Sequence, residues 1–349
     1  MHQENIQTLY QTYTGHLPEA IEPLAGAGSN RNYYRLKGTP QLIGVYGTSE
    51  AENRAFLYMA RHFEAKGLPV PHVYAQTDDA MAYLQEDLGD TSLFQAIEQG
   101  RNTGIFNEAE KTLLKQTIRL LPRIQFEGAE DMDFSVCYPQ AEFNRRSILW
   151  DLNYFKYCFL KATGIDFQEN LLEDDFENMT QVLLADTFST FMYRDFQSRN
   201  VMIREGKPYF IDFQGGRKGP VYYDVASFLW QAKARFPQHL REELIHDYLD
   251  ALHAYCPMPE SYFREQLRQF VLFRTLQVLG AYGFRGYFEQ KPHFLQSIPY
   301  AIGNLDQLLE EEFPAYPHLC KVLKQLTGLP VYATELNKRK LTVRVMSFS

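Results

Sequence analysis

The spacing of hydrophobic residues changes close to residue 88 and divides the chain into a strand-rich part and a helix-rich part. Before that point, one amphipathic helix is predicted within residues 1–20 and another after Ser49, which forms a capping pair with Glu52. Short apolar stretches bounded by turn residues predict strands at 21–24, 32–36, 41–46, 72–76 and 81–85. Together these elements predict a small β-rich lobe that also carries helices.

After about residue 90 the apolar residues recur at helical spacing, apart from one interruption at about 191–216. Inside it, apolar stretches at 201–203 and 209–211 surround a turn-rich connector, which predicts a β-hairpin. The last residues alternate like the first strand of a further domain, or like an edge strand on the helical lobe. We therefore expect an α+β fold with an N-lobe (1–87), a larger helical C-lobe (88–335) and a linker with the start of a further domain (336–349).

Composition narrows the class of protein. Of the 349 residues, 45% are hydrophobic and 22% are charged, which is typical of a globular protein with a sizeable core. The net charge of −8 argues against nonspecific binding to nucleic acid or to anionic membranes. The four cysteines show neither zinc-ligand spacing nor a disulfide pattern, and no stretch resembles a signal peptide or a membrane helix. We therefore predict a cytoplasmic protein without nucleic-acid or membrane partners.

The residues with the clearest chemistry lie in the interruption of the helical pattern. Residues 193–200 and 211–213 resemble the catalytic and metal-binding loops of kinases, with Asp195 and Asn200 five positions apart and Asp212 following across the hairpin. Phosphoryl transfer from ATP needs a carboxylate beside the attacking hydroxyl and oxygen ligands for Mg²⁺. Asp195 is therefore the predicted catalytic base, and Asn200 and Asp212 are the predicted Mg²⁺ ligands. Each residue alone would also suit a cap, a turn or an arginine pair, but the set favours catalysis.

The segment beyond this loop sharpens the resemblance. Gly219, Pro220, Tyr223 and Asp224 resemble the GP…YD segment of the aminoglycoside phosphotransferase and choline kinase superfamily. The resemblance implies a bilobal protein-kinase-like fold that uses ATP and Mg²⁺. It also makes Asp224 a structural support of the catalytic loop, and a capping role at the helix that follows would explain the same residue.

Within that superfamily, motifs at 198–200, 212–214, 274–280 and 297–299 resemble bacterial kinases that phosphorylate N-acetylmuramate and N-acetylglucosamine at the anomeric hydroxyl. Two positions depart from the pattern, because Tyr193 replaces a packing histidine of the loop and Gln197 stands where this branch usually has histidine. The tail 341–349 is similar to the opening strand of the C-terminal domain of RapZ-type RNase adapters. The resemblance thus implies an amino-sugar kinase of cell-wall recycling.

Nucleotide contacts are predicted in the N-lobe. A small, polar segment between two predicted strands can bind phosphates through its backbone N–H groups, or can simply form a hairpin turn. Its candidate residues are Gly26, Gly28, Ser29 and Asn30. Gln85 and Glu86 begin the connector between the lobes, which resembles the kinase hinge whose backbone bonds the adenine edge.

One expected nucleotide contact is missing. Kinases usually carry a lysine on the third strand, paired to a helix glutamate, that holds the α- and β-phosphates. Residues 41–46 contain no lysine, and Glu52, the helix partner by position, already has a capping role. Arg35 on the preceding strand is the candidate replacement, with a surface arginine as the alternative.

Other functions stay open at this point. The same chemistry would serve another small alcohol, such as an aminoglycoside, choline or a different sugar. Without the lysine, the chain would also suit a nucleotide-binding regulatory module, although three intact catalytic residues disfavour that role. Trp150, Tyr154 and Arg285 are candidate acceptor contacts, with a core or surface position as the simpler interpretation of each.

Overall fold

The computed structural model describes residues 2–24, 31–186 and 189–332. The predictions for Gly26, Gly28, Ser29, Asn30 and the tail 336–349 therefore lie outside the described residues. The chain divides into two compact units, each built from three segments. The first comprises Met1–Glu142, Phe188–Val221 and Glu243–Cys256, and the second comprises Phe143–Thr187, Tyr222–Glu242 and Pro257–Ser349.

A five-stranded antiparallel sheet opens the first unit, in the order β1-β2-β3-β5-β4. Its strands are β1 (Ala20–Leu24), β2 (Asn32–Lys37), β3 (Leu42–Tyr46), β4 (Val73–Gln76) and β5 (Ala82–Glu86). All five predicted strands are thus confirmed to within one residue at either end. Their alternating or continuous apolar stretches between turn residues were sufficient to place them.

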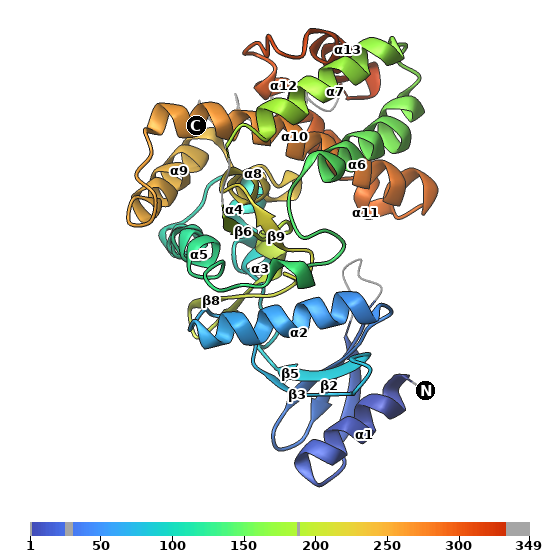
Figure 1. Ribbon diagram of the computed structural model, residues 1–349, viewed down its shortest axis with the longest axis vertical. Helices are drawn as coiled ribbons and strands as arrows, with labels where there is room; N and C mark the ends of the chain where they lie inside the picture. Colours follow the sequence, from blue (N-terminus) through green and yellow to red (C-terminus); the bar gives the residue numbers. More distant parts are fainter. Residues whose placement is uncertain (1, 25–30, 187–188, 333–349) are drawn as a thin grey trace. The chain divides into compact units, whose positions relative to one another are not determined.

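Two helices, α1 (His2–Thr14) and α2 (Glu50–Ala65), lie on opposite faces of this sheet (Figure 1). Ile6 and Tyr10 of α1 pack in one core with Leu84 of β5. Its neighbour Tyr83 points the other way and stacks on Phe56 of α2, with ring centroids 5.1 Å apart. Because successive side chains of a strand point to opposite faces, β5 packs against α1 on one face and against α2 on the other.

The remainder of the first unit carries the loops of interest. It contains α3 (Leu93–Ala96), α4 (Glu98–Thr103), α5 (Glu108–Phe126), β6 (Thr190–Met192), β7 (Val201–Arg204), β8 (Lys207–Phe210) and β9 (Arg217–Gly219). Strands β6 and β9 pair with each other, and β7 and β8 form the predicted hairpin. Its second strand begins earlier than predicted, because Glu205 and Gly206 both have positive φ (52° and 75°) and make a two-residue turn.

The second unit is helical, in line with the helical spacing of apolar residues after about residue 90. Its helices are α6 (Arg145–Phe155), α7 (Glu169–Leu183), α8 (Tyr222–Leu229), α10 (Glu260–Gly283), α11 (Pro292–Leu295), α12 (Ile298–Leu308) and α13 (Pro317–Thr327), while α9 (Gln238–Leu252) is shared with the first unit. The long helix α10 packs against α6, α8 and α12. A Cβ atom at its Gly280 would lie 2.7 Å from the backbone nitrogen of Phe155, so glycine permits this close approach to α6.

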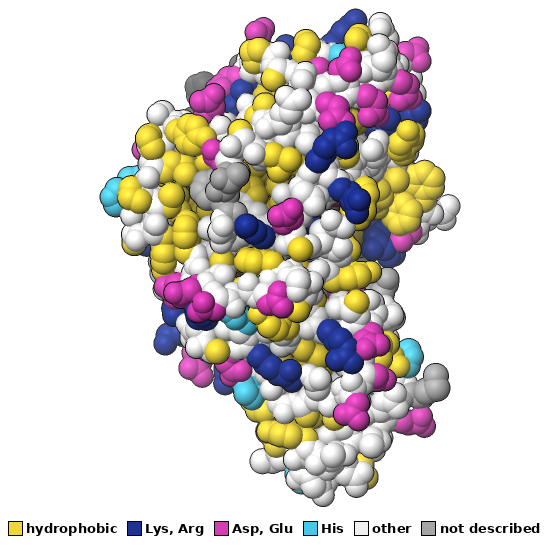
Figure 2. Space-filling view, viewed as in Figure 1, with side chains coloured by type: hydrophobic (Ala, Val, Ile, Leu, Met, Phe, Trp, Pro, Cys, Tyr) yellow, Lys and Arg dark blue, Asp and Glu magenta, His cyan; other side chains and the backbone are white. Residues whose placement is uncertain are grey.

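The surface mixes both signs of charge. Figure 2 shows acidic and basic side chains interspersed over the face in view, in keeping with the modest net charge. Among the described helices, none combines the length and the apolar character that crossing a membrane requires.

Candidate active site

The predicted catalytic loop follows directly after β6. Asp195 lies exposed within it, and Arg194 before it has a φ of 76°, a conformation that non-glycine residues adopt only where the surroundings enforce it. A 3₁₀ turn, Ser198–Asn200, closes the loop and buries Asn200. The side-chain nitrogen of Asn200 donates to the backbone carbonyl of Asp195 at 2.8 Å. This bond fixes the two predicted functional residues relative to each other.

The predicted metal loop meets the catalytic loop across the β7–β8 hairpin. The backbone nitrogen of Ile211 donates to the carbonyl of Asn200 at 3.0 Å, and the Asn200 side chain donates to Oδ2 of Asp212 at 3.2 Å. Asp212 itself, two positions after β8 ends, has a φ of 67°, a conformation that is uncommon for residues other than glycine. The structure thus brings Asp195, Asn200 and Asp212 together, as their spacing around a hairpin suggested.

The side chain of Tyr193 also connects the catalytic loop with the metal loop. Its ring is buried against Phe196, Phe210 and Phe213, and its hydroxyl donates a hydrogen bond to the backbone carbonyl of Ile211. From the sequence, Tyr193 was expected to be a packing residue that replaces histidine. The structure adds a polar role, because the phenol can reach across and bond the strand that leads into Asp212.

The electrostatics around Asp212 favour a bound cation. Burial raises the pKa of the Asp212 carboxyl, the charge of Asp195 raises it further, and a hydrogen bond from Gln214 and the charge of Arg31 oppose the increase. Nε2 of Gln214 donates to Oδ1 of Asp212 at 2.8 Å, while its Oε1 is buried and accepts no hydrogen bond from the described residues. Asn200 donates its hydrogen bonds to Asp195 and Asp212 through Nδ2, so its Oδ1 and the Asp212 carboxylate offer oxygen ligands and negative charge. This donor set fits Mg²⁺.

Helix α2 packs directly on the metal loop. Phe213 stacks on Phe56 at a centroid distance of 5.0 Å and meets Phe63 edge-on at 5.3 Å. Near the start of the same helix, the carboxylate of Glu52 forms an ion pair with Arg31, with Nη2 and Oε1 3.1 Å apart. The capping hydroxyl of Ser49 accepts from the backbone nitrogen of Glu52, so the side chain of Glu52 is available for this pair.

Arg31 is the site residue that the sequence did not single out. It directly precedes β2 and is only 6% exposed, and its Nε donates to Oδ1 of Asn53 at 3.3 Å. One feature of the sequence pointed to such a residue. Glu52 has the position of the kinase helix glutamate, but the third strand offers no lysine to pair with it. Which arginine would meet that glutamate depends on strand register, which local patterns do not specify.

Arg35, the cation suggested by the sequence, lies elsewhere on β2. Its guanidinium donates to the carboxylates of Asp87 (2.7 and 3.0 Å) and Asp90 (2.6 Å) and to the carbonyl of Gly89 (3.3 Å). Gln41 donates to Asp87 as well, at 2.7 Å. Arg35 therefore holds the connector that follows β5.

The predicted hinge residues close β5. Gln85 pairs with Ile43 and with Val73 across the sheet, and the backbone nitrogen of Glu86 donates to the carbonyl of His72 at 2.8 Å. The Glu86 carboxylate pairs with Arg204 of β7. Neither Glu86 nor Asp87 is simply solvated, because each is engaged by an arginine.

The remaining candidates lie in the second unit. Asp224 is fully buried within the first turn of α8, which begins at Tyr222, so it lies inside the helix and not at the predicted cap. Its support of the catalytic loop stays a prediction. Tyr154 packs on Phe284, Arg285 pairs with Glu289, and Trp150 is half exposed.

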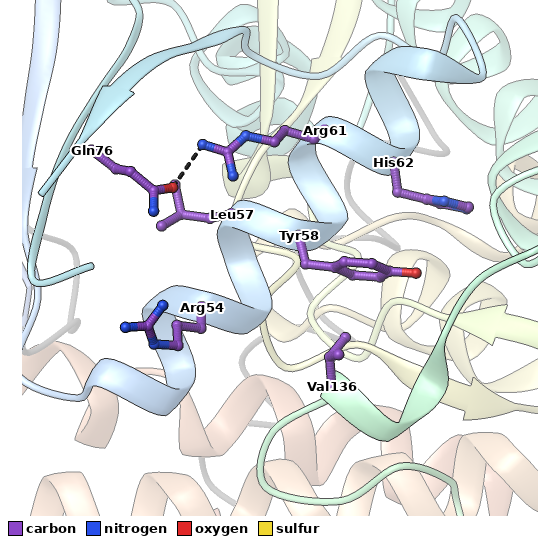
Figure 3. A pocket seen from close by; sticks show the side chains of 7 residues that line it. All are labelled: Arg54, Leu57, Tyr58, Arg61, His62, Gln76 and Val136. Carbon is purple, nitrogen blue, oxygen red and sulfur yellow. Dashed lines mark hydrogen bonds between the residues drawn. The ribbon is translucent and has the colours of Figure 1, made fainter. Parts of the chain in front are cut away.

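A surface pocket of about 490 Å³ lies on the outer side of α2 and involves none of these residues. Figure 3 shows its lining, in which Arg61 donates to Oε1 of Gln76 at 2.6 Å. Arg54 is held by Glu50, Tyr58 by the backbone nitrogen of Asp133, and His62 by the carbonyl of Gly128. Because its polar groups already have partners within the protein, the pocket adds nothing to the catalytic constellation.

Comparison with known proteins agrees with the geometry. The family model described as "Phosphotransferase enzyme family" matches residues 20–259. A relative from Pseudomonas aeruginosa, named N-acetylmuramate/N-acetylglucosamine kinase, is 25% identical over 323 residues, covering 90% of this chain and 89% of the relative. A relative of the same name from Neisseria meningitidis is 29% identical over 270 residues, covering 74% and 76%.

Solved structures confirm the fold. The choline kinase LicA from Streptococcus pneumoniae matches with a TM-score of 0.61 at 15% identity, over 88% of this chain and all (100%) of that one. An ADP-bound aminoglycoside phosphotransferase matches with a TM-score of 0.55 at 13% identity, over 86% of this chain and 95% of that one. The expected protein-kinase-like class, with a β-rich N-lobe and a mostly helical remainder, is therefore confirmed.

Proposed function

Because the chain belongs to the phosphotransferase enzyme family and is an ATP-dependent phosphotransferase, we propose that its acceptor is an amino sugar. The acceptor atom is the anomeric hydroxyl of N-acetylmuramate or N-acetylglucosamine, and the product enters cell-wall sugar recycling in the cytoplasm. One observation carries the proposal: Asp195, Asn200 and Asp212 converge in a chain whose relatives at 25% and 29% identity are named for these sugars.

Each residue of the constellation has a separate task. Asp195, exposed and fixed through its backbone to Asn200, orients the sugar hydroxyl and accepts its proton. Asn200 and Asp212 hold Mg²⁺ by oxygen atoms, and Gln214 orients the Asp212 carboxylate. When bound, Mg²⁺ supplies positive charge that offsets the charge on the phosphates during transfer.

The donor nucleotide contacts the N-lobe in this proposal. The connector that begins at Gln85 and Glu86 bonds the adenine edge through its backbone, and Gly26, Gly28, Ser29 and Asn30 are further candidates for phosphate binding. Asp224 supports the catalytic loop. An anionic or neutral sugar is compatible with the acceptor side, where acidic residues are accompanied by Arg145 and Arg146.

The test is release of ADP from MgATP with a panel of N-acetylmuramate, N-acetylglucosamine, glucosamine, choline and kanamycin. We expect turnover with an N-acetyl sugar, and a loss of kcat of about 10²–10⁴ in Asp195→Asn, because a general base contributes about that much. Binding of ADP to Asp195→Asn should persist, since Asp195 acts on the acceptor.

The outcomes separate the parts of the proposal. Turnover with choline or kanamycin alone would keep the chemistry and overturn the sugar. No turnover with any acceptor, with ADP still bound, would favour a regulatory nucleotide-binding role. Loss of ADP affinity in Asp195→Asn with unchanged turnover would overturn the role of Asp195.

A further inference from the structure

Strand β3 lacks the lysine that kinases usually carry on their third strand. Its residues, Leu42–Tyr46, carry no charge, although this is the strand from which kinases reach the nucleotide phosphates with a lysine. The phosphates of ATP carry several negative charges, and a site without a fixed cation on this side would leave the metal ion to balance them alone. A buried cation near the metal loop would share that task.

Arg31 meets that description. It directly precedes Asn32, the first residue of β2, and Asn32 lies opposite Tyr46, the last residue of β3. The side chain of Arg31 is 4% exposed, and its guanidinium forms the ion pair with Glu52. The guanidinium also lies over the Phe56 ring, with Cζ 5.8 Å from the ring centroid. Burial lowers the pKa of Arg31, but the neighbouring Tyr83, Tyr33 and Glu52 more than offset it, so the group keeps its charge.

The surroundings hold this guanidinium in one orientation. Asn53, which accepts from Nε, is fully buried and donates its own amide to the carbonyl of Ala80 at 2.9 Å. The Asn53 amide lies against Gly47, where an added Cβ would come within 2.2 Å of it. Glu52 is positioned by the capped first turn of α2. A guanidinium presents its N–H donors in a planar fork that matches the oxygen atoms of a phosphate, so an oriented arginine suits phosphate binding.

The same contacts connect Arg31 with the metal loop. The guanidinium lies over the ring of Phe56, and the same ring stacks on Phe213, the neighbour of Asp212. The charge of Arg31 also acts on the Asp212 carboxyl, where it opposes the increase in pKa. Stability alone gives little reason to bury Arg31, because the cost of removing its charge from water offsets much of its attraction to the partly exposed Glu52.

We propose that Arg31, oriented by Glu52, binds the phosphates of the nucleotide in the role that a third-strand lysine has in other kinases. The inference deepens the proposed function and rests on it for the use of a nucleotide. It moves this role from Arg35 to Arg31, because Arg35 holds the connector at Asp87–Asp90 while the charge of Arg31 acts on Asp212. A pair between the arginine that precedes β2 and the glutamate of α2 replaces a pair of lysine on β3 and glutamate on α2.

The test compares ADP with adenosine, which share the base and the ribose and differ only in the phosphates. Calorimetric titrations of both ligands, without acceptor, would be made with wild type, Arg31→Gln, Arg31→Lys, Glu52→Gln and Arg35→Gln. Arg54→Gln is the matched control, since Arg54 lies on α2 with a half-exposed side chain (51%) paired to Glu50. Unfolding midpoints of all variants would be measured alongside.

We expect Arg31→Gln to weaken ADP binding about 10-fold to 100-fold, the value of hydrogen bonds to a charged group, and to leave adenosine binding unchanged. Arg31→Lys should recover part of the loss because it restores the charge without the planar donors. Glu52→Gln should weaken ADP less than Arg31→Gln, because it affects only the orientation. Arg54→Gln should bind both ligands like wild type.

Equal losses for ADP and adenosine in Arg31→Gln would show a structural role and overturn the assignment. Unchanged ADP binding in Arg31→Gln with a selective loss in Arg35→Gln would return the role to Arg35. A wild-type protein that binds neither ligand would overturn the proposed function itself. A wild-type protein that binds ADP but phosphorylates no sugar would overturn only the acceptor, since no acceptor enters this experiment.

Discussion

The hydroxyl of Tyr193 is one of the hydrogen-bonding groups that connect the catalytic loop with the metal loop. Tyr193 donates to the carbonyl of Ile211, one residue before Asp212. Tyr193→Phe keeps the aromatic packing and leaves that carbonyl without its donor, so we expect the free energy of unfolding to fall by about 1–3 kcal/mol. We also expect kcat to fall, because the position of Asp212 is less well fixed. Urea unfolding and steady-state kinetics measure the two effects.

Tyr248→Phe is the matched control for this prediction. Tyr248 is also fully buried in the first unit, and its hydroxyl donates to Gln125 at 2.6 Å, away from both loops. It should lose stability to a similar extent and keep its kcat. A Tyr193→Phe enzyme that is destabilised but fully active would show that the bond serves folding alone.

At the scale of residues, the sequence predicts chemistry that depends on local spacing and misses pairs formed through space. Asp195, Asn200 and Asp212 could be placed together because a short hairpin brings its two ends side by side. The pair of Arg31 and Glu52 joins a strand to a helix, so its geometry depends on sheet register and on the approach of α2. For the same reason, the sequence did not show that Arg35 is bound by Asp87 and Asp90, which lie 52 and 55 positions further along the chain.

At the scale of elements, periodicity was enough to place the five strands, while exact boundaries depended on turns and caps. The strand β8 begins at Lys207 because a two-residue turn leaves Lys207 and Pro208 opposite Arg204 and Ile203. Helix α8 begins at Tyr222, before Asp224, although aspartate is a common cap. In both places, backbone conformation outweighed the preference of the side chain.

Helix α13 shows how an element can be capped from elsewhere. No side chain of its own cap residue, Tyr316, bonds its first turn. Instead, Oδ2 of Asp175 on α7 accepts from the backbone nitrogen of Leu319 at 2.6 Å. The first N–H groups of a helix have no intrahelical partner, so Asp175→Ala should lower the free energy of unfolding by about 1–3 kcal/mol. Urea unfolding measures this, with the exposed neighbour Asp174→Ala as control.

The sign of the pH dependence gives a second readout for Asp175. Burial raises the pKa of its carboxyl despite the opposing backbone donors of Leu319 and His318. The folded state therefore binds the proton more tightly than the unfolded state. Ionised Asp175 lowers the free energy of unfolding at pH values above its folded pKa, and this loss disappears as the pH falls through that pKa. Asp175→Asn keeps an acceptor oxygen without the charge, so it should be more stable than Asp175→Ala. Asp175→Asn that is as unstable as Asp175→Ala would contradict the capping role.

At the scale of the whole molecule, the proposed catalytic and nucleotide residues concentrate in one unit. Asp195, Asn200, Asp212, Arg31 and Glu52 all belong to the first unit, which is assembled from three separate segments. The sequence suggested a boundary after residue 87 because the texture of the hydrophobic pattern changes there. Which distant segments join one compact unit depends on contacts between them, and local patterns do not report such contacts.

This distribution predicts where a nucleotide should stabilise the chain. A ligand that binds only the folded state lowers the population of locally open states at its site. Adding MgADP should therefore slow amide hydrogen exchange in α2 and across residues 193–214, both of which belong to the first unit. Helices α12 and α13, in the second unit, should exchange nearly as before. Hydrogen-exchange mass spectrometry with and without MgADP resolves these peptides.

Asp212→Asn separates the metal from the nucleotide in this experiment. It removes a charged oxygen ligand while keeping the shape of the side chain, so protection of residues 193–214 by MgADP should decrease, and the part that ADP gives without Mg²⁺ should persist. Protection confined to α12 and α13 would place the nucleotide away from the constellation of Asp195, Asn200 and Asp212. In that case the convergence of these three residues would need an explanation other than phosphoryl transfer.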